Sequence, residues 1–130
     1  GSNIEPEHHF ARALDILSSE CELVAHSEAV RTAPVGFQQQ PDFLNAALVV
    51  RTTLERRAFK AYLKDVEHRL GRVRGLIKSG PRTMDLDIVA WDGEIVDESY
   101  FQHDYVRGPV DAVLADSGRS LISAGPVRHN

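Results

Sequence analysis

The sequence is short of several features that mark specialised classes of protein. Its single cysteine, Cys21, excludes an intramolecular disulfide framework and a cysteine-built zinc site. No apolar run approaches the roughly 20 residues that span a bilayer, and no charged and then apolar leader opens the chain. Fifteen basic and nineteen acidic residues give a net charge of -4, which excludes the positive field of a general nucleic-acid binder. We therefore expect a cytoplasmic protein without nucleic-acid or membrane partners, and a buried, inert Cys21 rather than a nucleophile.

The composition that remains is that of an ordinary folded protein. Hydrophobic residues make up 42% and charged residues 26% of the 130 residues, as in globular domains. This length is enough for one compact core and too short for two. We predict a single domain over residues 1–130.

The spacing of apolar residues predicts both helices and strands. Helical spacing marks residues 5–19, and again the stretch from a capping-box pair, Thr52 and Glu55, to a glycine cap at Gly71. Strands are predicted over residues 21–32, 43–53, 83–91 and 94–96, with a loop at 33–41 and a tight turn at Asp92-Gly93. This order predicts an α+β fold: a ferredoxin-like antiparallel sheet with helices on one face, whose first strand is absent from this numbering.

Two carboxylates are prominent on the predicted strand at 83–91. Residues two apart share one face of a strand, so Asp85 and Asp87 lie side by side while Leu86 faces the core. Like charges at this spacing are tolerable beside a divalent cation, and magnesium commonly takes one or two protein carboxylates together with water and phosphate oxygens. The alternative is a solvated sheet face without a metal.

The stretch before these carboxylates has the opposite charge. Residues 69–84 contain five basic side chains and no Asp or Glu. Guanidinium groups match phosphate oxygens, and the glycines of this stretch suit a loop that closes over a nucleotide. Nucleic-acid binding is the weaker alternative, because the neighbouring carboxylates repel a phosphodiester backbone. The five basic residues are Arg69, Arg72, Arg74, Lys78 and Arg82.

Three blocks of the sequence carry a family pattern. The most specific is Gly-Pro-Arg-Thr-Met-Asp-Leu-Asp-Ile at residues 80–88, and the others are Gly-Ser-Asn at 1–3 and Arg-Thr-Ala-Pro-Val-Gly at 31–36 followed by Gln-Pro-Asp-Phe-Leu-Asn-Ala at 40–46. Over residues 1 to about 107 the chain resembles the 6-hydroxymethyl-7,8-dihydropterin pyrophosphokinase family. The resemblance implies transfer of pyrophosphate from ATP to the pterin hydroxymethyl group, which gives AMP and the pterin diphosphate in folate biosynthesis.

The resemblance also implies a phosphate and metal site. Asp85 and Asp87 would hold two magnesium ions that bridge the ATP phosphates, and together with Arg72 and Arg82 they form the implied catalytic set. Glu67 falls on a family position, with a solvated helix residue as the alternative. The residues implied in ATP binding are Arg72, Arg74, Arg82, His103 and Arg107, and an ordinary surface histidine is the alternative for His103.

A pterin site is implied in the same way by Thr32, Val35, Phe43 and Asn45. The Asn45 amide has the donors and acceptor needed to read the amino and keto edge of the ring. Val35 would contribute through its backbone, and Phe43 would stack on the flat ring or else belong to the core. The implied reaction is in-line attack of the hydroxymethyl oxygen on the β-phosphorus of ATP, promoted by positioning and charge neutralisation.

The pattern departs from the family after His103. Arg107-Gly108-Pro109 arrives early and has proline where the family has an aromatic that stacks on the pterin. Residues 110–130 carry no recognisable family pattern, and a short helix at 111–114 is predicted there. Two functions therefore stay open: the active enzyme, or a divergent paralogue that binds nucleotide or pterin without this activity or acts on a related pterin. The expected partners are ATP and a hydroxymethyl pterin, and the expected state is a monomer with a homo-oligomer as the alternative.

Overall fold

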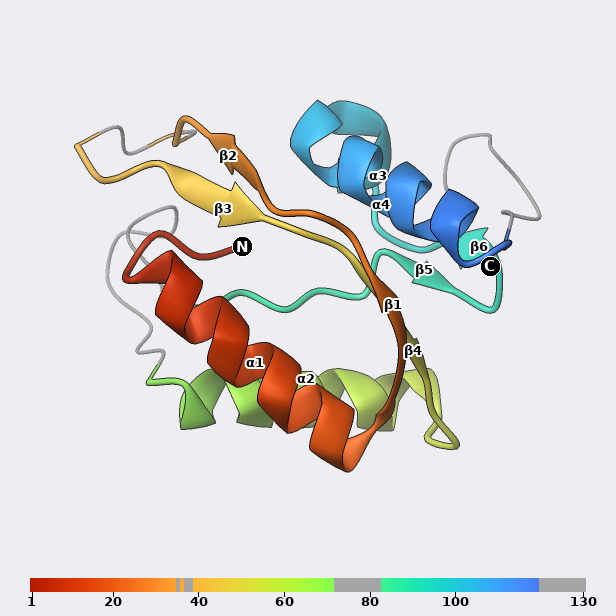
Figure 1. Cartoon of the computed structure of the whole chain (residues 1–130). Coiled ribbons are helices and arrows are strands. Elements are labelled where there is room, and N and C mark those ends of the chain that lie inside the picture. Colours follow the sequence, from red (N-terminus) through yellow and green to blue (C-terminus); the bar gives the residue numbers. More distant parts are fainter. Residues whose placement is uncertain (35, 37–38, 72–82, 120–130) are drawn as a thin grey trace.

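The computed structural model describes residues 1–34, 36, 39–71 and 83–119. It is a mixture of helices and short antiparallel strand pairs (Figure 1), which confirms the predicted α+β class. Within these residues, no helix is both long enough and apolar enough to span a membrane. The elements are, in chain order, α1 (Pro6–Glu20), β1 (Glu22–His26), β2 (Val30–Thr32), β3 (Phe43–Asn45), β4 (Leu48–Arg51), α2 (Arg56–Arg69), β5 (Ala90–Trp91), β6 (Glu94–Ile95), α3 (Ser99–Gln102) and α4 (Asp104–Asp116).

Strands β1 to β4 form one long, curved hairpin (Figure 1). β1 pairs with β4 and β2 pairs with β3, both antiparallel. Ser27 lies at the bend between the two pairs: its backbone N–H donates to the Ala47 carbonyl at 2.8 Å, and its hydroxyl accepts from the Ala47 N–H at 2.9 Å. The side chain of Ser27 thus replaces a backbone partner where the ladder bends.

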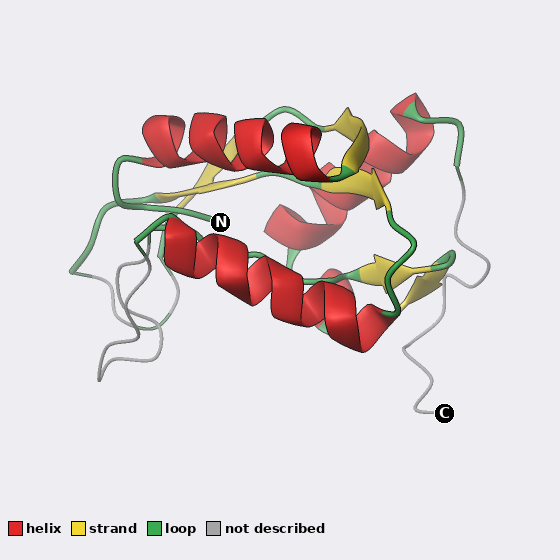
Figure 2. Cartoon of the chain, turned by 90° about the horizontal axis from the view of Figure 1, so that it is seen from below, coloured by secondary structure: helices red, strands yellow, loops and turns green. Residues whose placement is uncertain are grey.

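The hairpin is covered on both faces (Figure 2). On one face Leu17 of α1 and Leu63 of α2 pack with Leu48 of β4, as expected for helices on one face of a sheet. On the opposite face Val110 of α4 packs with Ala47, the residue next to Leu48. Neighbouring residues of a strand point to opposite faces, so α4 adds a layer. The short helix predicted at 111–114 is part of this longer helix.

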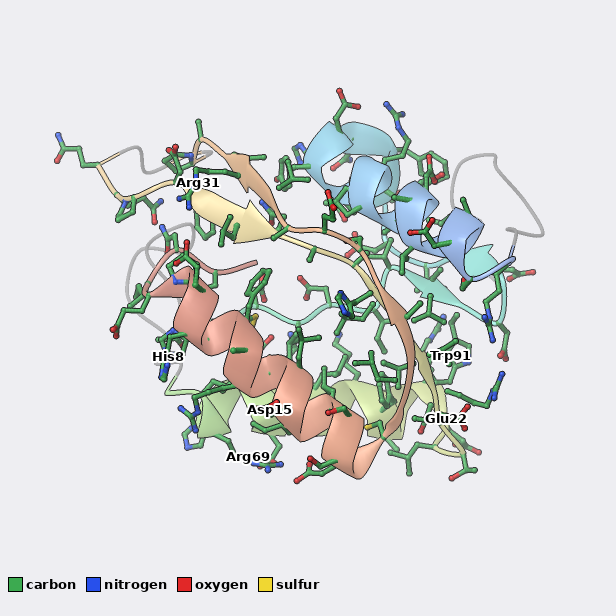
Figure 3. The ribbon with its side chains drawn as sticks, in the orientation of Figure 1. His8, Asp15, Glu22, Arg31, Arg69 and Trp91 are labelled. Atoms are coloured by element: carbon green, nitrogen blue, oxygen red, sulfur yellow. The ribbon has the colours of Figure 1, made fainter. Side chains whose placement is uncertain are left out.

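The two helices of the first layer are joined at their ends. Arg69, labelled in Figure 3, donates to both carboxylate oxygens of Glu20 at 2.8 and 2.7 Å, and the Tyr62 hydroxyl donates to Glu20 at 2.7 Å. These bonds lower the pKa of Glu20 to about 2, because Arg69 and then Tyr62 stabilise the charged carboxylate. Cys21, the next residue, is half-buried against this core rather than fully buried.

The ends of α2 confirm one predicted cap and correct the other. The helix begins at Arg56 with Glu55 as its N-cap, and no side chain caps it. The predicted capping box is therefore wrong. The Thr52 hydroxyl instead accepts a hydrogen bond from the Leu54 N–H at 3.1 Å, and this bond closes a turn that precedes the helix. At the other end Gly71 has a φ of +85° and its N–H donates to the His68 carbonyl, as predicted for a glycine cap.

The strand predicted at 83–91 is much shorter in the structure. β5 holds only Ala90–Trp91, and it pairs with β6 across the predicted Asp92-Gly93 turn, whose φ values are +50° and +84°. The preceding residues make no continuous ladder with a neighbouring strand. Asp85 exchanges two backbone hydrogen bonds with Gly1, and Ser2 exchanges two with Leu44 of β3. The opening residues therefore lie between β3 and the segment that carries the two aspartates.

Candidate active site

A cleft of about 1290 Å³ brings the two halves of the predicted site together. Residues from β2 and β3, from the start of the chain and from the segment before β5 contribute to its walls, and the same space extends along α1, α2, β4 and α4. Sequence positions more than 50 apart thus face one space. Among the lining residues are Gly1, Thr32, Phe43, Asn45, Asp85 and Asp87.

The Asn45 amide is held in a fixed orientation at one part of this cleft. Its Nδ2 donates to the Thr32 hydroxyl at 2.8 Å, across the β2–β3 pair. Its Oδ1 lies so close to Gly1 that a β-carbon built on that residue would be 2.6 Å away, so only glycine fits there without a shift. Phe43 is half-buried and lines the cleft, and it belongs to none of the core clusters of the described residues. An amide and an aromatic side chain thus line one space, and these are the two kinds of group that suit a flat heterocycle.

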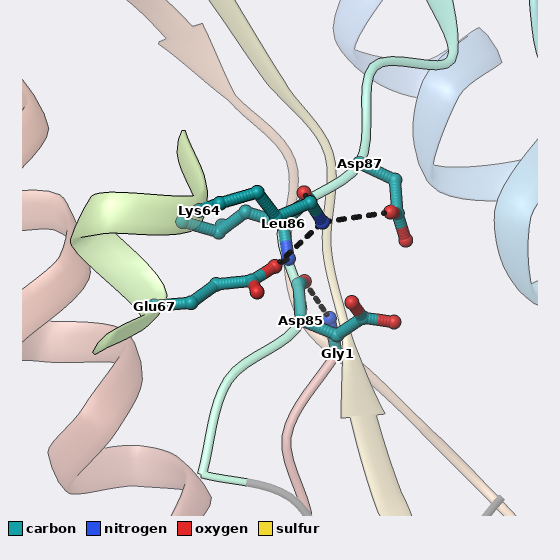
Figure 4. Close-up of polar contacts among 6 residues, drawn as sticks. All are labelled: Gly1, Lys64, Glu67, Asp85, Leu86 and Asp87. Carbon is teal, nitrogen blue, oxygen red and sulfur yellow. Dashed lines mark hydrogen bonds and ion pairs between the residues drawn. The ribbon is translucent and has the colours of Figure 1, made fainter. Parts of the chain in front are cut away.

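The two aspartates lie on either side of a residue whose backbone is held by side chains of α2 (Figure 4). Leu86 donates its N–H to Glu67 Oε2 at 2.6 Å, and its carbonyl accepts from Lys64 Nζ at 3.0 Å. Asp85 is fixed by the pair of backbone bonds to Gly1, at 2.8 and 2.9 Å. Residues three apart on a helix share a face, so one turn of α2 takes the place of a neighbouring strand here.

Glu67 is buried, with 2% of its surface exposed. Besides the Leu86 N–H it accepts a hydrogen bond from Lys64 Nζ at 3.0 Å. The alternative of a solvated helix residue is therefore wrong. The sequence analysis missed Lys64, because a lysine three residues before a glutamate on a helix is equally the pattern of an exposed ion pair.

Asp87 is in an unfavourable place for a negative charge. Partial removal from water, and then the charge of Asp85, raise the pKa of its carboxyl group above the ordinary value, while Lys64 opposes the shift. The Lys64 amine is 3.4 Å from Asp87 Oδ1, and about half of the Asp87 side chain (52%) remains exposed. The half-buried Asp85 and the exposed Asp87 thus place two adjacent carboxylates, with an excess of negative charge, at the cleft.

The two aspartates suit magnesium, which takes only part of its ligands from the protein, better than a metal ion whose ligands all come from the protein. Within the described residues, no group of three or more His, Cys, Asp or Glu side chains is placed to hold an ion. Magnesium keeps several waters and is commonly bound by one or two carboxylates plus substrate phosphates. Two adjacent carboxylates at the wall of an open cleft meet that requirement.

The other predicted ATP residues are divided between two situations. His103 lies at the junction of α3 and α4 and stacks on Tyr105, with ring centroids 4.8 Å apart. Arg107 pairs with Asp104 one turn earlier, and Pro109 is buried within α4. The cleft is lined at this end by Tyr105 rather than by His103 or Arg107, and the sequence analysis did not single out Tyr105. Four predicted site residues, Val35, Arg72, Arg74 and Arg82, lie outside the described residues.

Comparison with known proteins gives the context for this site. The family model described as 7,8-dihydro-6-hydroxymethylpterin-pyrophosphokinase matches residues 1–115. The chain is 37% identical over 99 residues to the 2-amino-4-hydroxy-6-hydroxymethyldihydropteridine pyrophosphokinase of Haemophilus influenzae, covering 74% of this chain and 61% of that protein. The enzyme of the same name from Bacillus subtilis is 33% identical over 100 residues, covering 75% and 59%.

The chain spans about three-fifths of the length of these two relatives. The matched residues nevertheless include both aspartates, the β2–β3 pair and the whole of α2. The family match thus covers the part of the chain that forms the cleft. The chain belongs to the 7,8-dihydro-6-hydroxymethylpterin-pyrophosphokinase family.

Proposed function

We propose that this protein transfers pyrophosphate from ATP to the hydroxymethyl group of 6-hydroxymethyl-7,8-dihydropterin, giving AMP and the pterin diphosphate. The observation that carries the proposal is the single cleft lined by the Asn45–Thr32 pair and by Asp85 and Asp87. One part suits a flat heterocycle, and the other suits charged phosphates with a cation. Membership of the family supports both assignments. We further infer a cytoplasmic location.

The pterin would bind against β3 and the opening residues. Phe43 supplies an aromatic face for the ring, and the Asn45 amide would read its amino and keto edge. Thr32 acts through Asn45, because its hydroxyl holds the amide in one orientation. Gly1 lies between Asn45 and Asp85, so a ring bound at Asn45 would direct its substituent toward the aspartates.

Asp85 and Asp87 would hold two magnesium ions with the ATP phosphates. Bound magnesium would neutralise phosphate charge and orient the β-phosphoryl group. For the remaining phosphate and nucleotide contacts we propose Arg72, Arg74, Arg82, His103 and Arg107. The guanidinium groups among them match phosphate oxygens in charge and geometry.

The reaction is an in-line displacement at the β-phosphorus. The hydroxymethyl oxygen forms a bond to that phosphorus, and the bond from the β-phosphorus to the α,β-bridging oxygen breaks. AMP leaves with the bridging oxygen, and the hydroxyl proton passes to water. Phosphoryl transfer needs positioning and charge stabilisation rather than a protein nucleophile, and the cleft offers polar and charged groups for those two tasks.

Phosphorus NMR of the purified protein with ATP, Mg²⁺ and the pterin tests this function. The expected result is the appearance of AMP and pterin diphosphate, lost in Asp87→Ala. The matched control is Asp15→Ala, an exposed aspartate on α1 outside the cleft lining, which should leave turnover unchanged. Turnover that persists in Asp87→Ala would contradict the metal assignment.

The pterin part of the cleft is tested separately by ligand fluorescence. Asn45→Ala should weaken pterin binding roughly ten-fold or more, because the amide edge is lost. Val30→Ala, at the exposed strand position paired with Asn45, is the control and should bind as the wild type does. Equal affinity in Asn45→Ala would rule out this residue as the pterin reader.

A divergent paralogue that binds nucleotide or pterin without transfer is the alternative function. Arg107 is paired with Asp104, and the proline in place of the family's aromatic is buried in α4; both observations favour it. If ATP and the pterin both bind while neither AMP nor pterin diphosphate forms, this alternative replaces the proposed activity.

A further inference from the structure

We propose that Lys64 is a positioning residue that serves as the resident counter-ion of the Asp85–Asp87 pair and competes with a divalent cation for Asp87. The inference rests on the proposed function, because it takes the two aspartates as the cation ligands. It assigns a role to a side chain that is outside the set of predicted site residues.

The Lys64 amine is the centre of a compact network. Its Nζ contacts Glu67 Oε2 at 3.0 Å, the Leu86 carbonyl oxygen at 3.0 Å and Asp87 Oδ1 at 3.4 Å (Figure 4). An ammonium group has three N–H donors, and three acceptors surround it here. The amine is therefore fixed in place by groups from α2 and from the aspartate segment.

The burial of Glu67 keeps the Lys64 amine in this position. The Glu67 side chain is 3% exposed and that of Lys64 is 30% exposed. A buried carboxylate without a cationic partner is costly, so Glu67 retains the amine at the edge of the cleft. The Lys64 charge therefore persists beside Asp87 whether or not the cleft holds a ligand.

The three contacts of the Lys64 amine differ in length, and the difference separates its structural contacts from the one that a cation can replace. The two short contacts, to Glu67 and to Leu86, orient the backbone between the aspartates. The longest contact, to Asp87, is the one that an arriving cation would replace. A cation can then bind without disturbing the two contacts that hold the segment, but it must overcome repulsion from the amine.

Titration of the protein with Mn²⁺ in the absence of nucleotide tests the inference, with free Mn²⁺ followed by electron paramagnetic resonance. Lys64→Gln removes the charge and keeps an N–H donor for Glu67, so the fold should survive. We expect it to bind Mn²⁺ about five- to ten-fold more tightly than the wild type, the size expected from one charge removed within a few ångströms of the ion in a partly solvated site.

Two further variants separate charge from structure. Lys64→Arg keeps the positive charge and should return the Mn²⁺ affinity to near that of the wild type. Lys60→Gln removes the same charge from an exposed position one turn earlier on α2 and should leave the affinity unchanged within two-fold. If Lys64 were only a structural partner of Glu67, Lys64→Gln would lower the melting temperature and leave Mn²⁺ affinity unaltered.

The outcomes distinguish this inference from the function on which it rests. Equal or weaker Mn²⁺ binding in Lys64→Gln overturns the counter-ion role alone, provided that the wild type binds Mn²⁺ and forms product. If neither protein binds Mn²⁺, the metal assignment of Asp85 and Asp87 fails and the counter-ion role fails with it.

Discussion

Asp87, a proposed cation ligand, lies in an unfavourable electrostatic environment. Removal from water and the neighbouring Asp85 both oppose its ionisation, and Lys64 compensates only in part, so the pKa remains raised. A raised carboxyl pKa in the folded state means that folding favours the protonated form. The stabilisation from that preference is complete below the unfolded value and is lost as the pH rises through the folded value. At neutral pH the ionised Asp87 therefore reduces stability.

Asp87→Asn should consequently stabilise the fold while it removes the proposed cation ligand. We expect its melting temperature to exceed that of the wild type at pH 7, with the difference shrinking as the pH falls to the ordinary aspartate value of 3.8 and below, because the wild-type carboxyl group becomes protonated. Mg²⁺ should raise the melting temperature of the wild type and leave that of the variant unchanged. Calorimetry across this pH range checks both statements, and a lower melting temperature for the variant at pH 7 would contradict the first.

The sequence predicts that Asp85 and Asp87 lie side by side, but it does not predict the α2 side chains that hold the backbone between them. Two carboxylates separated by one residue are a local pattern, as is the strand alternation that puts Thr32 and Asn45 near one surface. The contact between Glu67 and Leu86 joins residues 19 apart across an α2 face. Nothing local distinguishes that glutamate from an exposed one, because its burial is decided by where the segment before β5 crosses the helix.

At the scale of elements, the helix ends are where local chemistry and tertiary structure compete. Gly71 ends α2 with a positive φ that side chains adopt reluctantly, and this was predictable from one residue type. Thr52 and Glu55 have the spacing of a capping box, yet the chain turns at Leu54 before the helix begins. Similarly, the predicted strand at 83–91 is reduced to β5, because Gly1, Lys64 and Glu67 supply partners that an adjacent strand would otherwise supply.

Gly71→Ala should lower the free energy of unfolding by about 1 kcal/mol, since alanine at a left-handed φ is strained. Among the described residues, no atom beyond the chain neighbours lies within 4 Å of the added β-carbon, so the loss reports backbone conformation. Gly108→Ala lies inside α4, where no described atom beyond its chain neighbours and its own helix backbone is within 4 Å, and it should instead raise the free energy of unfolding by about 0.5 to 1 kcal/mol. Urea denaturation of both variants checks this opposition of sign, and a shift in the same direction for both would refute it.

The ion pair between Glu20 of α1 and Arg69 of α2 predicts a loss of stability at acid pH. The pKa of Glu20 is lowered from 4.5 to about 2, so its interaction with Arg69 stabilises the fold above pH 4.5 and is lost as the pH falls toward 2. Glu20→Gln should therefore reduce the fall in melting temperature between pH 4.5 and 2 relative to the wild type. Glu22→Gln, which disrupts an exposed pair with Arg51 instead, serves as the control. Identical acid profiles for wild type and Glu20→Gln would show that the link contributes nothing to stability.

At the scale of the whole molecule, the hairpin binds two layers into one structure. Leu48 and Val50 face the core of α1 and α2, while Ala47 faces the core beneath α4. Loss of packing on one face therefore disturbs the strand that supports the other. The sequence predicted one domain from length alone, and the second layer escaped prediction because the apolar residues of α4 are interrupted by a glycine and a proline.

A single cooperative unfolding transition follows from this shared strand. Leu63→Ala on one face should lower the free energy of unfolding by about 3 kcal/mol and Val110→Ala on the other by about 2 kcal/mol. Both should move one and the same transition, seen equally by far-ultraviolet circular dichroism and by fluorescence of the single tryptophan, Trp91. Two separate transitions in Val110→Ala would show that α4 unfolds independently.

The bend at Ser27 divides the hairpin into a part that forms the core and a part that lines the cleft. The half formed by β1 and β4 supplies core residues such as Leu48 and Val50, whereas Thr32, Phe43 and Asn45 on the half formed by β2 and β3 belong to none of the core clusters found among the described residues. Apart from the buried Leu44, the outer half is therefore only weakly constrained by folding. Under the proposed function, substitutions beyond the bend would change which heterocycle is recognised, while the inner half and the stability that it provides would stay as they are.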